Sequence, residues 1–582
     1  MQELKRLYGC FGPYKKDLFL GGFFVLIETS FELIIPILMA DLIDVGVANR
    51  DLSYILHKGV QMGICALFSL ISGLLYARFA ARAAYGWGAR IRDAEYEKVQ
   101  QFAFANLDRF DTASLVTRMT TDVTVLQNAV NGGLRPLARS PIMLIMGLGL
   151  AFYMNARLSI VFFVCAPLLG VILLAIVHKV APMYTVLQKA VDRLNSVVEE
   201  NLTAIRAVKA YVRGDYEEEK FQTVNKDLTR IGQKTFGLAV LNLPTLQCLM
   251  YTTIVLIMWF GGNMILQSRL QVGELTGFLS YVLQVMNSVM LISNAFLLLT
   301  RSLASAHRIG EVLTEPVVLT SPENARTTVE NGSVDFENVS FKYRADAKEF
   351  ALSDVNLHIL PGQTVGVLGG TGSAKSTLVQ LIPRLYDVTE GAVKVGGHDV
   401  REYDLQTLRD AVGIVLQKNV LFSGTVRENL LWGNADADDD MLWEACRAAG
   451  AAEFLERMPK RLDTEVGQGG VNFSGGQKQR LCIARTLLKN PKVLIFDDAT
   501  SAVDTATEAG IRATLAGLRD MTKIIIAQRI TSVMHSDSIV VLDDGKVHAV
   551  GTHEALLKND PIYQEIYATQ MRGGDDDASE ND

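Results

Sequence analysis

Residues 369–377 read GGTGSAKST and follow directly on the short apolar stretch TVGVL at 364–368. A glycine-rich loop between a strand and a helix points backbone N–H groups, and the partial positive charge of the helix N-terminus, at one spot that suits a triphosphate. Lys375 is expected to reach the β- and γ-phosphates of a nucleotide, and Ser376 to bind Mg²⁺. The candidate nucleotide-binding residues of this loop are Gly369, Gly370, Thr371, Gly372, Ser373, Ala374, Lys375, Ser376 and Thr377.

The loop departs from the P-loop pattern at one position. Ala374 stands where the pattern has a glycine immediately before the lysine. Its methyl group is expected to crowd the phosphates slightly, but it removes neither the lysine nor the hydroxyl. Nucleotide binding is therefore expected to survive.

A second apolar stretch, VLIF at 493–496, ends in two carboxylates, Asp497 and Asp498. A carboxylate at the tip of a buried strand can hold Mg²⁺, and Asp497 is the candidate. Asp498 stands where a general base would orient an attacking water. With the loop at 369–377, this pattern predicts a P-loop nucleoside triphosphatase that uses ATP and Mg²⁺.

The sequence FSGGQ at 473–477, just before an apolar helix at 481–488, is a second candidate phosphate-binding loop. We call this loop and the loop at 369–377 the two phosphate cradles. One domain does not need two cradles for one nucleotide. The second makes sense if it serves a nucleotide bound to a partner domain, so the sequence predicts a dimer with ATP sandwiched at the interface.

In order and spelling, these motifs resemble those of ATP-binding cassette (ABC) exporters, and the resemblance covers essentially the whole chain. It implies a half-transporter, in which six transmembrane helices with long cytoplasmic extensions are fused to a cytosolic α/β P-loop domain. It also implies roles for further residues. These are Tyr343 as the aromatic on adenine, Gln417 at the γ-phosphate and Mg²⁺, residues 464–470 as the exporter-specific loop, Phe473, Ser474, Gly475, Gly476 and Gln477 as the signature, and Asp504 in the D-loop.

Two departures from the family pattern concern hydrolysis. The catalytic glutamate is replaced by Asp498, and the switch histidine by Gln528. Asp is one methylene shorter, and a misplacement near 1 Å can cost on the order of 10²-fold in rate. This combination resembles the degenerate subunit of heterodimeric bacterial exporters, whose partner is a second half-transporter with intact Glu and His. A homodimer with a slow site, an ATP-gated channel or regulatory subunit, and an importer built on the same fold are the alternatives.

The first 300 residues hold the apolar excess of a chain that is 49% hydrophobic and 20% charged. About 20 apolar residues of helix span a bilayer core. Lys and Arg concentrate at the N-terminus and in the two long segments between spans two and three and between spans four and five, which indicates that these lie in the cytoplasm. The chain is thus expected to be a multi-pass membrane protein, and the resemblance to bacterial exporters implies the bacterial inner membrane. The six expected spans are 18–40, 60–79, 141–155, 158–177, 241–266 and 275–299.

The two long cytoplasmic segments are expected to be helical and to turn around near residues 106–114 and 214–219. The predicted domains are a transmembrane domain at 1–313, a polar linker at 314–332, an ATP-binding cassette at 333–571 and a disordered acidic tail at 572–582.

Two carboxylates, Glu28 and Glu32, fall inside the first span, four residues apart on one helix face. Charges in a membrane span face a cavity or a partner. They are therefore candidates for contact with a small amphiphilic substrate, or for a hydrogen bond to a neighbouring helix. The net charge of −7 speaks against nucleic acid as a partner, and the six scattered cysteines predict neither disulfides nor a metal site.

Overall fold

The computed structural model describes residues 2–498 and 505–579, which form two units. The membrane unit contains residues 2–100 and Asp111–Glu315. The α/β unit contains Gln101–Phe110 and the described residues from Pro316 onward. A ten-residue piece of the first half of the chain thus belongs to the α/β unit.

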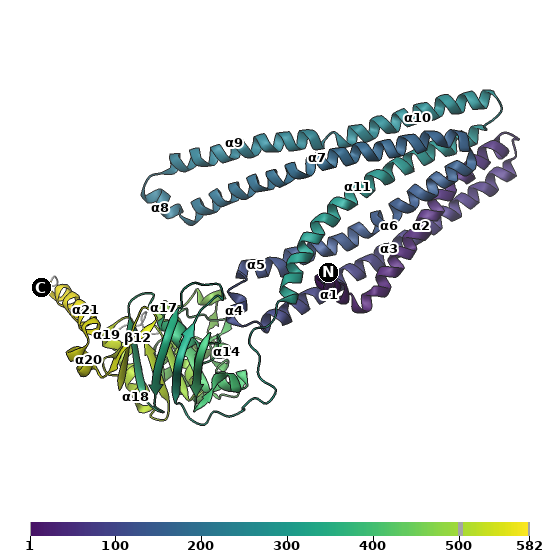
Figure 1. The fold of residues 1–582 in the computed structure, drawn as a ribbon. Coiled ribbons are helices and arrows are strands. Elements are labelled where there is room, and N and C mark those ends of the chain that lie inside the picture. Colours follow the sequence, from purple (N-terminus) through teal and green to yellow (C-terminus); the bar gives the residue numbers. More distant parts are fainter. Residues whose placement is uncertain (1, 499–504, 580–582) are drawn as a thin grey trace. The chain divides into compact units, whose positions relative to one another are not determined.

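The membrane unit is entirely helical (Figure 1). Its elements are α1 (Gln2–Gly9), η1 (Gly12–Tyr14), α2 (Lys15–Asp41), the π-helical η2 (Leu42–Val47), α3 (Leu52–Gln100), α5 (Thr112–Thr117), the π-helical η3 (Arg118–Asp122), α6 (Val123–Met154), α7 (Ala156–Thr203), α8 (Ile205–Ala210), α9 (Gly214–Ala239), α10 (Asn242–Leu266) and α11 (Val272–Thr314).

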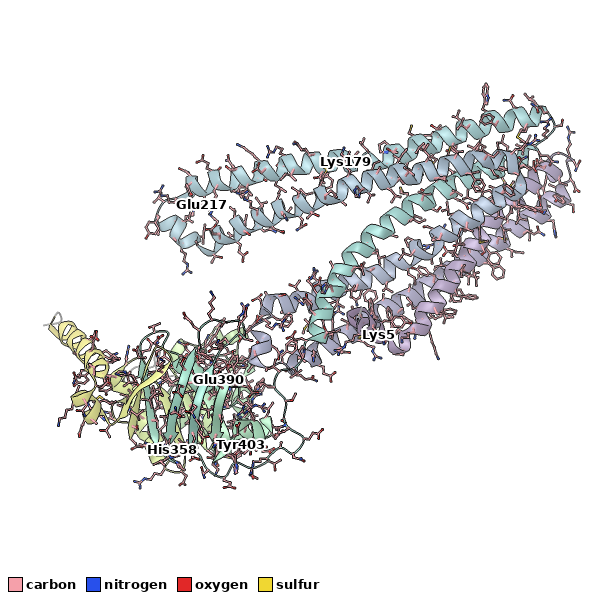
Figure 2. All side chains as sticks on the ribbon, in the orientation of Figure 1. Lys5, Lys179, Glu217, His358, Glu390 and Tyr403 are labelled. Atoms are coloured by element: carbon pink, nitrogen blue, oxygen red, sulfur yellow. The ribbon has the colours of Figure 1, made fainter. Side chains whose placement is uncertain are left out.

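Six helical stretches of the described chain are long and apolar enough to cross a membrane, which confirms the predicted number of spans. Several run to more than 40 residues, about twice what a bilayer core needs. The surplus length carries the polar and charged residues, such as Lys179 on α7 and Glu217 on α9 (Figure 2). The six stretches are Gly12–Val47, Leu52–Gln100, Thr112–Met154, Ala156–Thr203, Gly214–Leu266 and Val272–Ile292.

One predicted turn is misplaced along the sequence. The chain turns between the long helices α7 and α9 through α8 (Ile205–Ala210), so residues 214–219 are already in the first turn of α9. Asp215 and Glu217 explain the difference, because carboxylates are favourable near a helix N-terminus and stabilise the start of α9 there.

The acidic C-terminal segment also differs from expectation, since it is helical as far as Ser579 within α21 (Pro561–Ser579). The segment continues a helix that has already formed. It therefore adds residues to the helix without the cost of nucleating a new one.

The α/β unit contains three sheets and short helices (Figure 1). Its strands are β1 (Val334–Phe341), β2 (Leu352–Ile359), β3 (Thr364–Gly369), β4 (Glu390–Val395), β5 (His398–Asp399), β6 (Val412–Val415), β7 (Gly424–Thr425), β8 (Glu465–Val466), β9 (Val493–Asp497), β10 (Thr522–Ile526), β11 (Ser538–Asp543) and β12 (Lys546–Gly551). Its helices are α4 (Phe104–Leu107), α12 (Lys375–Gln380), η4 (Val400–Glu402), α13 (Leu405–Ala411), α14 (Val426–Leu431), α15 (Asp439–Ala448), α16 (Ala452–Glu456), η5 (Arg461–Asp463), η6 (Gln468–Gly470), α17 (Gly475–Leu488), α18 (Thr505–Gly517), α19 (Ile530–Val533), α20 (His553–Asn559) and α21.

The largest sheet has the strand order β12-β11-β3-β10-β9-β6, and its five strands β11, β3, β10, β9 and β6 are parallel. These strands are buried on both faces, which is why they read as continuous apolar runs. Ile526 pairs with both Val367 and Asp497, so the strands end at one level. The segments that follow the strands therefore meet at one edge, where open α/β sheets bind ligands.

The segment Gln101–Phe110 packs within the α/β unit through a fully buried asparagine. The Nδ2 atom of Asn106 donates to the carbonyl of Pro316 at 2.9 Å, and its Oδ1 atom accepts from the backbone N–H of Val318 at 3.3 Å. Both polar atoms of this buried side-chain amide are therefore hydrogen-bonded. They hold the segment Gln101–Phe110 against the beginning of the longer part of the unit, at Pro316 and Val318.

Candidate functional site

The phosphate loop lies at the carboxyl end of β3, as predicted, and its backbone is tightly constrained. A Cβ atom added at Gly369 would lie 2.3 Å from the carbonyl oxygen of Leu542, so no side chain fits there. Gly372 has a φ of +85°, a conformation that glycine adopts without strain. Ala374 caps α12 in the left-handed region at φ +67°, where the P-loop pattern has glycine.

Lys375 and Ser376 open α12 and face the ends of the neighbouring strands. The Lys375 ammonium donates to the carbonyls of Gly369 and Gly370 at 2.9 and 2.8 Å, and burial lowers its pKa against the opposing pull of Asp498 and Asp497. The Ser376 hydroxyl donates to Asp497 Oδ1 at 2.7 Å. The structure thus places the predicted hydroxyl and carboxylate against each other.

Asp498 and Gln528, at the two departures from the family pattern, contact each other. Gln528 Nε2 donates to Asp498 Oδ2 at 2.8 Å, and Gln417 makes a further side-chain hydrogen bond to Asp498. Burial raises the pKa of the Asp498 carboxyl, although these bonds and Lys375 act against the rise. Burial likewise raises the pKa of Asp497, with the neighbouring charge of Asp498 adding to the effect.

Tyr343 stands at the rim of the same pocket. Its hydroxyl lies 2.8 Å from Thr377 Oγ1, and its ring meets the ring of Tyr386 edge-on, with centroids 5.3 Å apart. Tyr386 in turn donates to Asp108 Oδ2 at 2.8 Å, so the pocket connects to the segment Gln101–Phe110. About half of the Tyr343 residue stays exposed.

Residues 369–377 line one cavity of about 630 Å³ together with Tyr343, Gln417, Asp497, Asp498 and Gln528. Sequence reasoning missed a contribution from the C-terminal helix, because Ile566 and Gln570 of α21 also line it. Gln570 accepts from the N–H of Ile530 at 2.8 Å and donates to the carbonyl of Gln528 at 2.8 Å. These two bonds hold the backbone of residues 528–530. No motif marks these two residues.

The FSGGQ residues form a different site. Ser474 and Gln477 make a reciprocal cap at the start of α17, with Ser474 Oγ accepting at 3.3 Å and Gln477 Oε1 accepting at 2.9 Å. Phe473 is buried, whereas Ser474 is exposed, and none of the described residues that line the 630 Å³ cavity belongs to 473–477. Asp504, the predicted D-loop residue, lies outside the described residues.

Comparisons with known proteins identify both halves. The family model of the ABC transporter transmembrane region matches residues 18–289, and the model described as ABC transporter matches residues 352–501. The uncharacterized ABC transporter ATP-binding protein YfiB of Bacillus subtilis is 35% identical over 96% of this chain and 97% of its own length.

The chain belongs to the ABC transporter family. An ATP-dependent lipid A-core flippase of Desulfotalea psychrophila is 30% identical over 97% of this chain and 99% of its own. A bacterial Atm1-family ABC exporter solved with ATP bound has the same fold, with a TM-score of 0.79 and 24% identity over 96% of this chain and 98% of that one. The chain is therefore an ABC half-transporter of the exporter type and a multi-pass inner-membrane protein with a cytoplasmic ATPase domain.

The pocket of this ABC transporter fits a nucleotide with its magnesium ion. Mg²⁺ in phosphate sites takes one or two protein oxygens and completes its shell with phosphate and water. The hydroxyl of Ser376 and the carboxylate of Asp497, 2.7 Å apart, supply such a pair. The described residues hold no cluster of three or more His, Cys, Asp or Glu side chains that would cage a metal by itself.

The two carboxylates of the first span are paired with arginines of α6. Arg135 bonds to Glu28 and Arg139 to Glu32, and Arg139 Nη1 also lies 3.6 Å from Glu28 Oε1. Glu28 is almost fully buried, whereas Glu32 is partly exposed. The structure thus gives both carboxylates a partner on a neighbouring helix, and contact with a substrate stays a prediction.

Proposed function

We propose that this chain is the degenerate-site subunit of a heterodimeric ABC exporter that moves small amphiphilic molecules outward. In this assignment the pocket of residues 369–377 binds ATP and Mg²⁺ but hydrolyses ATP slowly, while Ser474–Gln477 completes the active site of a partner half-transporter. The likeness to a lipid A-core flippase along the whole chain supports an amphiphilic cargo.

The observation that carries the proposal is the contact between Asp498 and Gln528. At the two positions where the family has a glutamate and a histidine, this chain has an aspartate whose carboxylate is bound by a glutamine amide at 2.8 Å. An amide cannot change its protonation as an imidazole can. The hydrogen bond also ties the shorter carboxylate of Asp498 to the amide of Gln528.

The separation of the two cradles supports the proposed pairing. The exposed Ser474 caps α17 outside the pocket that holds Lys375, so it is free to meet nucleotide bound by another subunit. The capping hydrogen bonds with Gln477 fix this serine at a helix N-terminus, where backbone N–H groups and the helix dipole favour phosphate.

The test restores the family residues in the chain, copurified with the half-transporter it assembles with. In a complex whose partner has its catalytic glutamate replaced by glutamine, Asp498→Glu together with Gln528→His is expected to raise ATP turnover on the order of 10-fold or more, because a general base alone contributes about 10²–10⁴-fold. Lys375→Ala in the restored background is the control that returns turnover to its earlier level.

Two outcomes would contradict the proposal. If the restored chain turns over ATP no faster than the original, the lesion lies elsewhere, with Ala374 as the first position to test. If the chain purifies alone as a homodimer with substrate-stimulated turnover at the rate of the paired complex, the assignment as the degenerate half of a heterodimer is wrong.

A further inference from the structure

The C-terminal helix α21 holds the backbone of residues 528–533, which we call the switch segment. Gln570 Nε2 donates to the carbonyl of Gln528, and Gln570 Oε1 accepts from the N–H of Ile530, both at 2.8 Å. Ile530 begins α19, and the side chain of the preceding Arg529 does not cap this helix. The first N–H groups of a helix have no partner within the helix. Gln570 therefore supplies an acceptor that the start of α19 needs.

Helix α21 is itself anchored, so the place of Gln570 is defined. Asp560 is almost fully buried, accepts from the N–H of Tyr563 at 2.7 Å and lies 3.0 Å from Nε2 of His548 through its other carboxylate oxygen. Tyr563 is fully buried and belongs to one apolar cluster with Ile530 of the switch segment. These contacts fix the first turn of α21, and Gln570 follows Tyr563 about two helical turns later.

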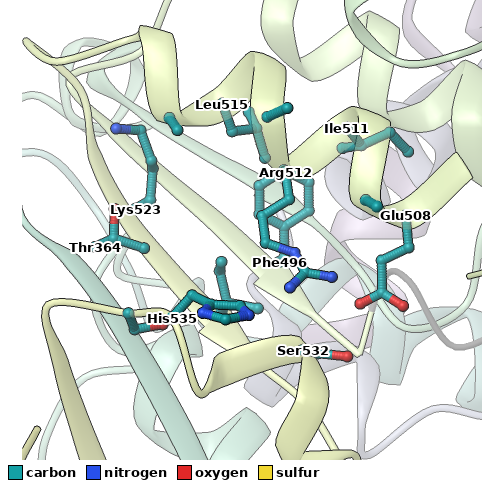
Figure 3. Close-up of a pocket in the computed structure, with 14 residues that line it drawn as sticks. Thr364, Phe496, Glu508, Ile511, Arg512, Leu515, Lys523, Ser532 and His535 are labelled. Atoms are coloured by element: carbon teal, nitrogen blue, oxygen red, sulfur yellow. The ribbon is translucent and has the colours of Figure 1, made fainter. Parts of the chain in front are cut away.

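The switch segment also borders a cavity of the α/β unit. Ser532 of α19 and the following His535 line a space of about 380 Å³ along α18 (Figure 3). None of the described residues that line this space belongs to α21. Arg512 of α18 donates to the carbonyl of Thr531 at 3.2 Å. Because an unfilled space offers few packing contacts, the bonds from α21 contribute much of what fixes the start of α19.

Gln528 lies at the end of the nucleotide pocket where a third phosphate is expected. Its Nε2 atom donates to Asp498 Oδ2 at 2.8 Å. The charge of Asp498 acts on Lys375, the residue expected to reach the β- and γ-phosphates. A hydrogen-bond donor at this place can meet a nucleoside triphosphate, whereas a diphosphate does not extend to it. The position of Gln528 therefore affects ATP more than ADP.

We propose that Gln570 is a positioning residue that sets Gln528 for the third phosphate of ATP, so that α21 contributes to the preference of the pocket for ATP over ADP. Gln570 acts through the backbone of residues 528–530. When the binding-competent position is only partly populated, the apparent affinity falls by that fraction. Loss of the two hydrogen bonds lowers this population. The inference rests on the proposed binding of ATP to this pocket, and it is independent of the hydrolysis rate.

The test measures nucleotide affinity at this pocket in the assembled complex, with the P-loop lysine of the partner half-transporter replaced by alanine. Displacement of trinitrophenyl-ATP gives the affinities of ADP and of the β,γ-imido analogue of ATP, which is not hydrolysed. Gln570→Ala is expected to weaken binding of the analogue about 5-fold or more, the factor that one net hydrogen bond represents. Binding of ADP is expected to change less than about 2-fold, because a ligand that binds both positions of the switch segment equally is insensitive to their populations.

Matched variants separate positioning from a general effect on the helix. Gln570→Met keeps the length of the side chain, removes both hydrogen bonds and is expected to act as Gln570→Ala does. Gln564→Ala is the control, because Gln564 lies on the same helix and donates to the carbonyl of Leu557 at 2.9 Å. It is expected to leave the preference for the analogue over ADP intact. In a Gln528→Ala background, Gln570→Ala is expected to add no further loss, since a positioning residue acts through the residue that it positions.

The proposal is overturned if Gln570→Ala and Gln570→Met bind the analogue as tightly as the unchanged chain, or if both weaken the analogue and ADP equally. An undiminished effect of Gln570→Ala in the Gln528→Ala background would overturn it as well. In each of these cases the unchanged chain still binds nucleotide, so the proposed function stands. If the unchanged chain binds neither nucleotide, the proposed function fails, and this inference fails with it.

Discussion

Two residues in the nucleotide pocket hold a backbone conformation that side chains disfavour. Ala374 has a φ of +67° and Asp498 a φ of +53°. A residue other than glycine costs on the order of 1–3 kcal/mol in this region, with aspartate among the better tolerated. Ala374 stands where the family pattern has a glycine, so this substitution adds local strain to the site. Asp498 stands where the pattern has a glutamate, which tolerates this conformation no better than aspartate.

The strain at Ala374 predicts an asymmetry between two substitutions in one loop. Ala374→Gly removes the strain and costs some unfolded-state entropy, so the free energy of unfolding is expected to stay within about 0.5 kcal/mol of its value. Gly372→Ala places a side chain at φ +85° and is expected to destabilise the α/β unit by about 1 kcal/mol or more. Thermal unfolding of the two variants checks this. A loss of stability in Ala374→Gly as large as in Gly372→Ala would contradict it.

The raised pKa of Asp498 predicts a pH dependence with a definite sign. Above the usual aspartate pKa of about 3.9 and up to the raised folded-state value, the folded chain holds more protons than the unfolded chain. The free energy of unfolding contributed by this group therefore falls as pH rises through that window. Asp498→Asn removes the contribution. Its melting temperature relative to the unchanged chain is expected to increase as pH rises from about 4, and a constant difference would contradict the assignment.

Most residues of the nucleotide pocket could be predicted from the sequence, because they directly follow apolar strands. Asp497, Gln417 and Gln528 each stand just after or at the end of a parallel strand, and sheet geometry brings them together. Gln570 could not be found in this way. It reaches the site through the packing of α21, which leaves no local pattern in the sequence.

Among the elements, α2 and α6 are joined by a ladder of charges. Glu28 and Glu32 are four residues apart, as are Arg135 and Arg139, so one helical turn aligns both pairs. In a membrane a carboxylate without a partner is costly. The ladder therefore holds the first and third spans together.

A double-mutant cycle on this ladder measures the coupling. Arg135→Gln leaves Glu28 buried with only Arg139 nearby and is expected to lower the free energy of unfolding by about 2 kcal/mol. Glu28→Gln with Arg135→Gln is expected to cost less than the sum of the two single changes, by about 1 kcal/mol or more. Thermal unfolding in detergent supplies the three values, and strict additivity would show that the two side chains do not interact.

The helices themselves could be predicted from hydropathy and loop charge, since each span is a long apolar run. The pairing of α2 with α6 could not, because both arginines fall before the apolar run at 141–155 and look like cytoplasmic residues. The ion pairs set these arginines against Glu28 and Glu32 of the first predicted span, which the hydropathy of α6 does not indicate.

For the whole molecule, the separation of the two phosphate cradles predicts that substitutions in them change the ATP turnover of the assembled pair to different extents. Ser474→Ala alters the surface proposed to serve the partner's nucleotide and is expected to lower ATP turnover on the order of 10-fold or more. Lys375→Ala alters this chain's own site, which we propose to be slow, and is expected to leave most turnover in place. Steady-state ATPase measurements on the copurified complex check both. If Lys375→Ala abolishes turnover while Ser474→Ala spares it, this chain carries the hydrolytic site.

The membership of Gln101–Phe110 in the α/β unit has a consequence for biogenesis. The ribosome makes this segment about 200 residues before Pro316, the residue whose carbonyl binds Asn106. At about 5–20 residues per second, the segment waits roughly 10–40 s before Pro316, where the rest of its unit begins, is synthesised. The α/β unit therefore cannot be completed until all six candidate spans have been synthesised, and a fragment that starts at Pro316 lacks a piece of its own interior.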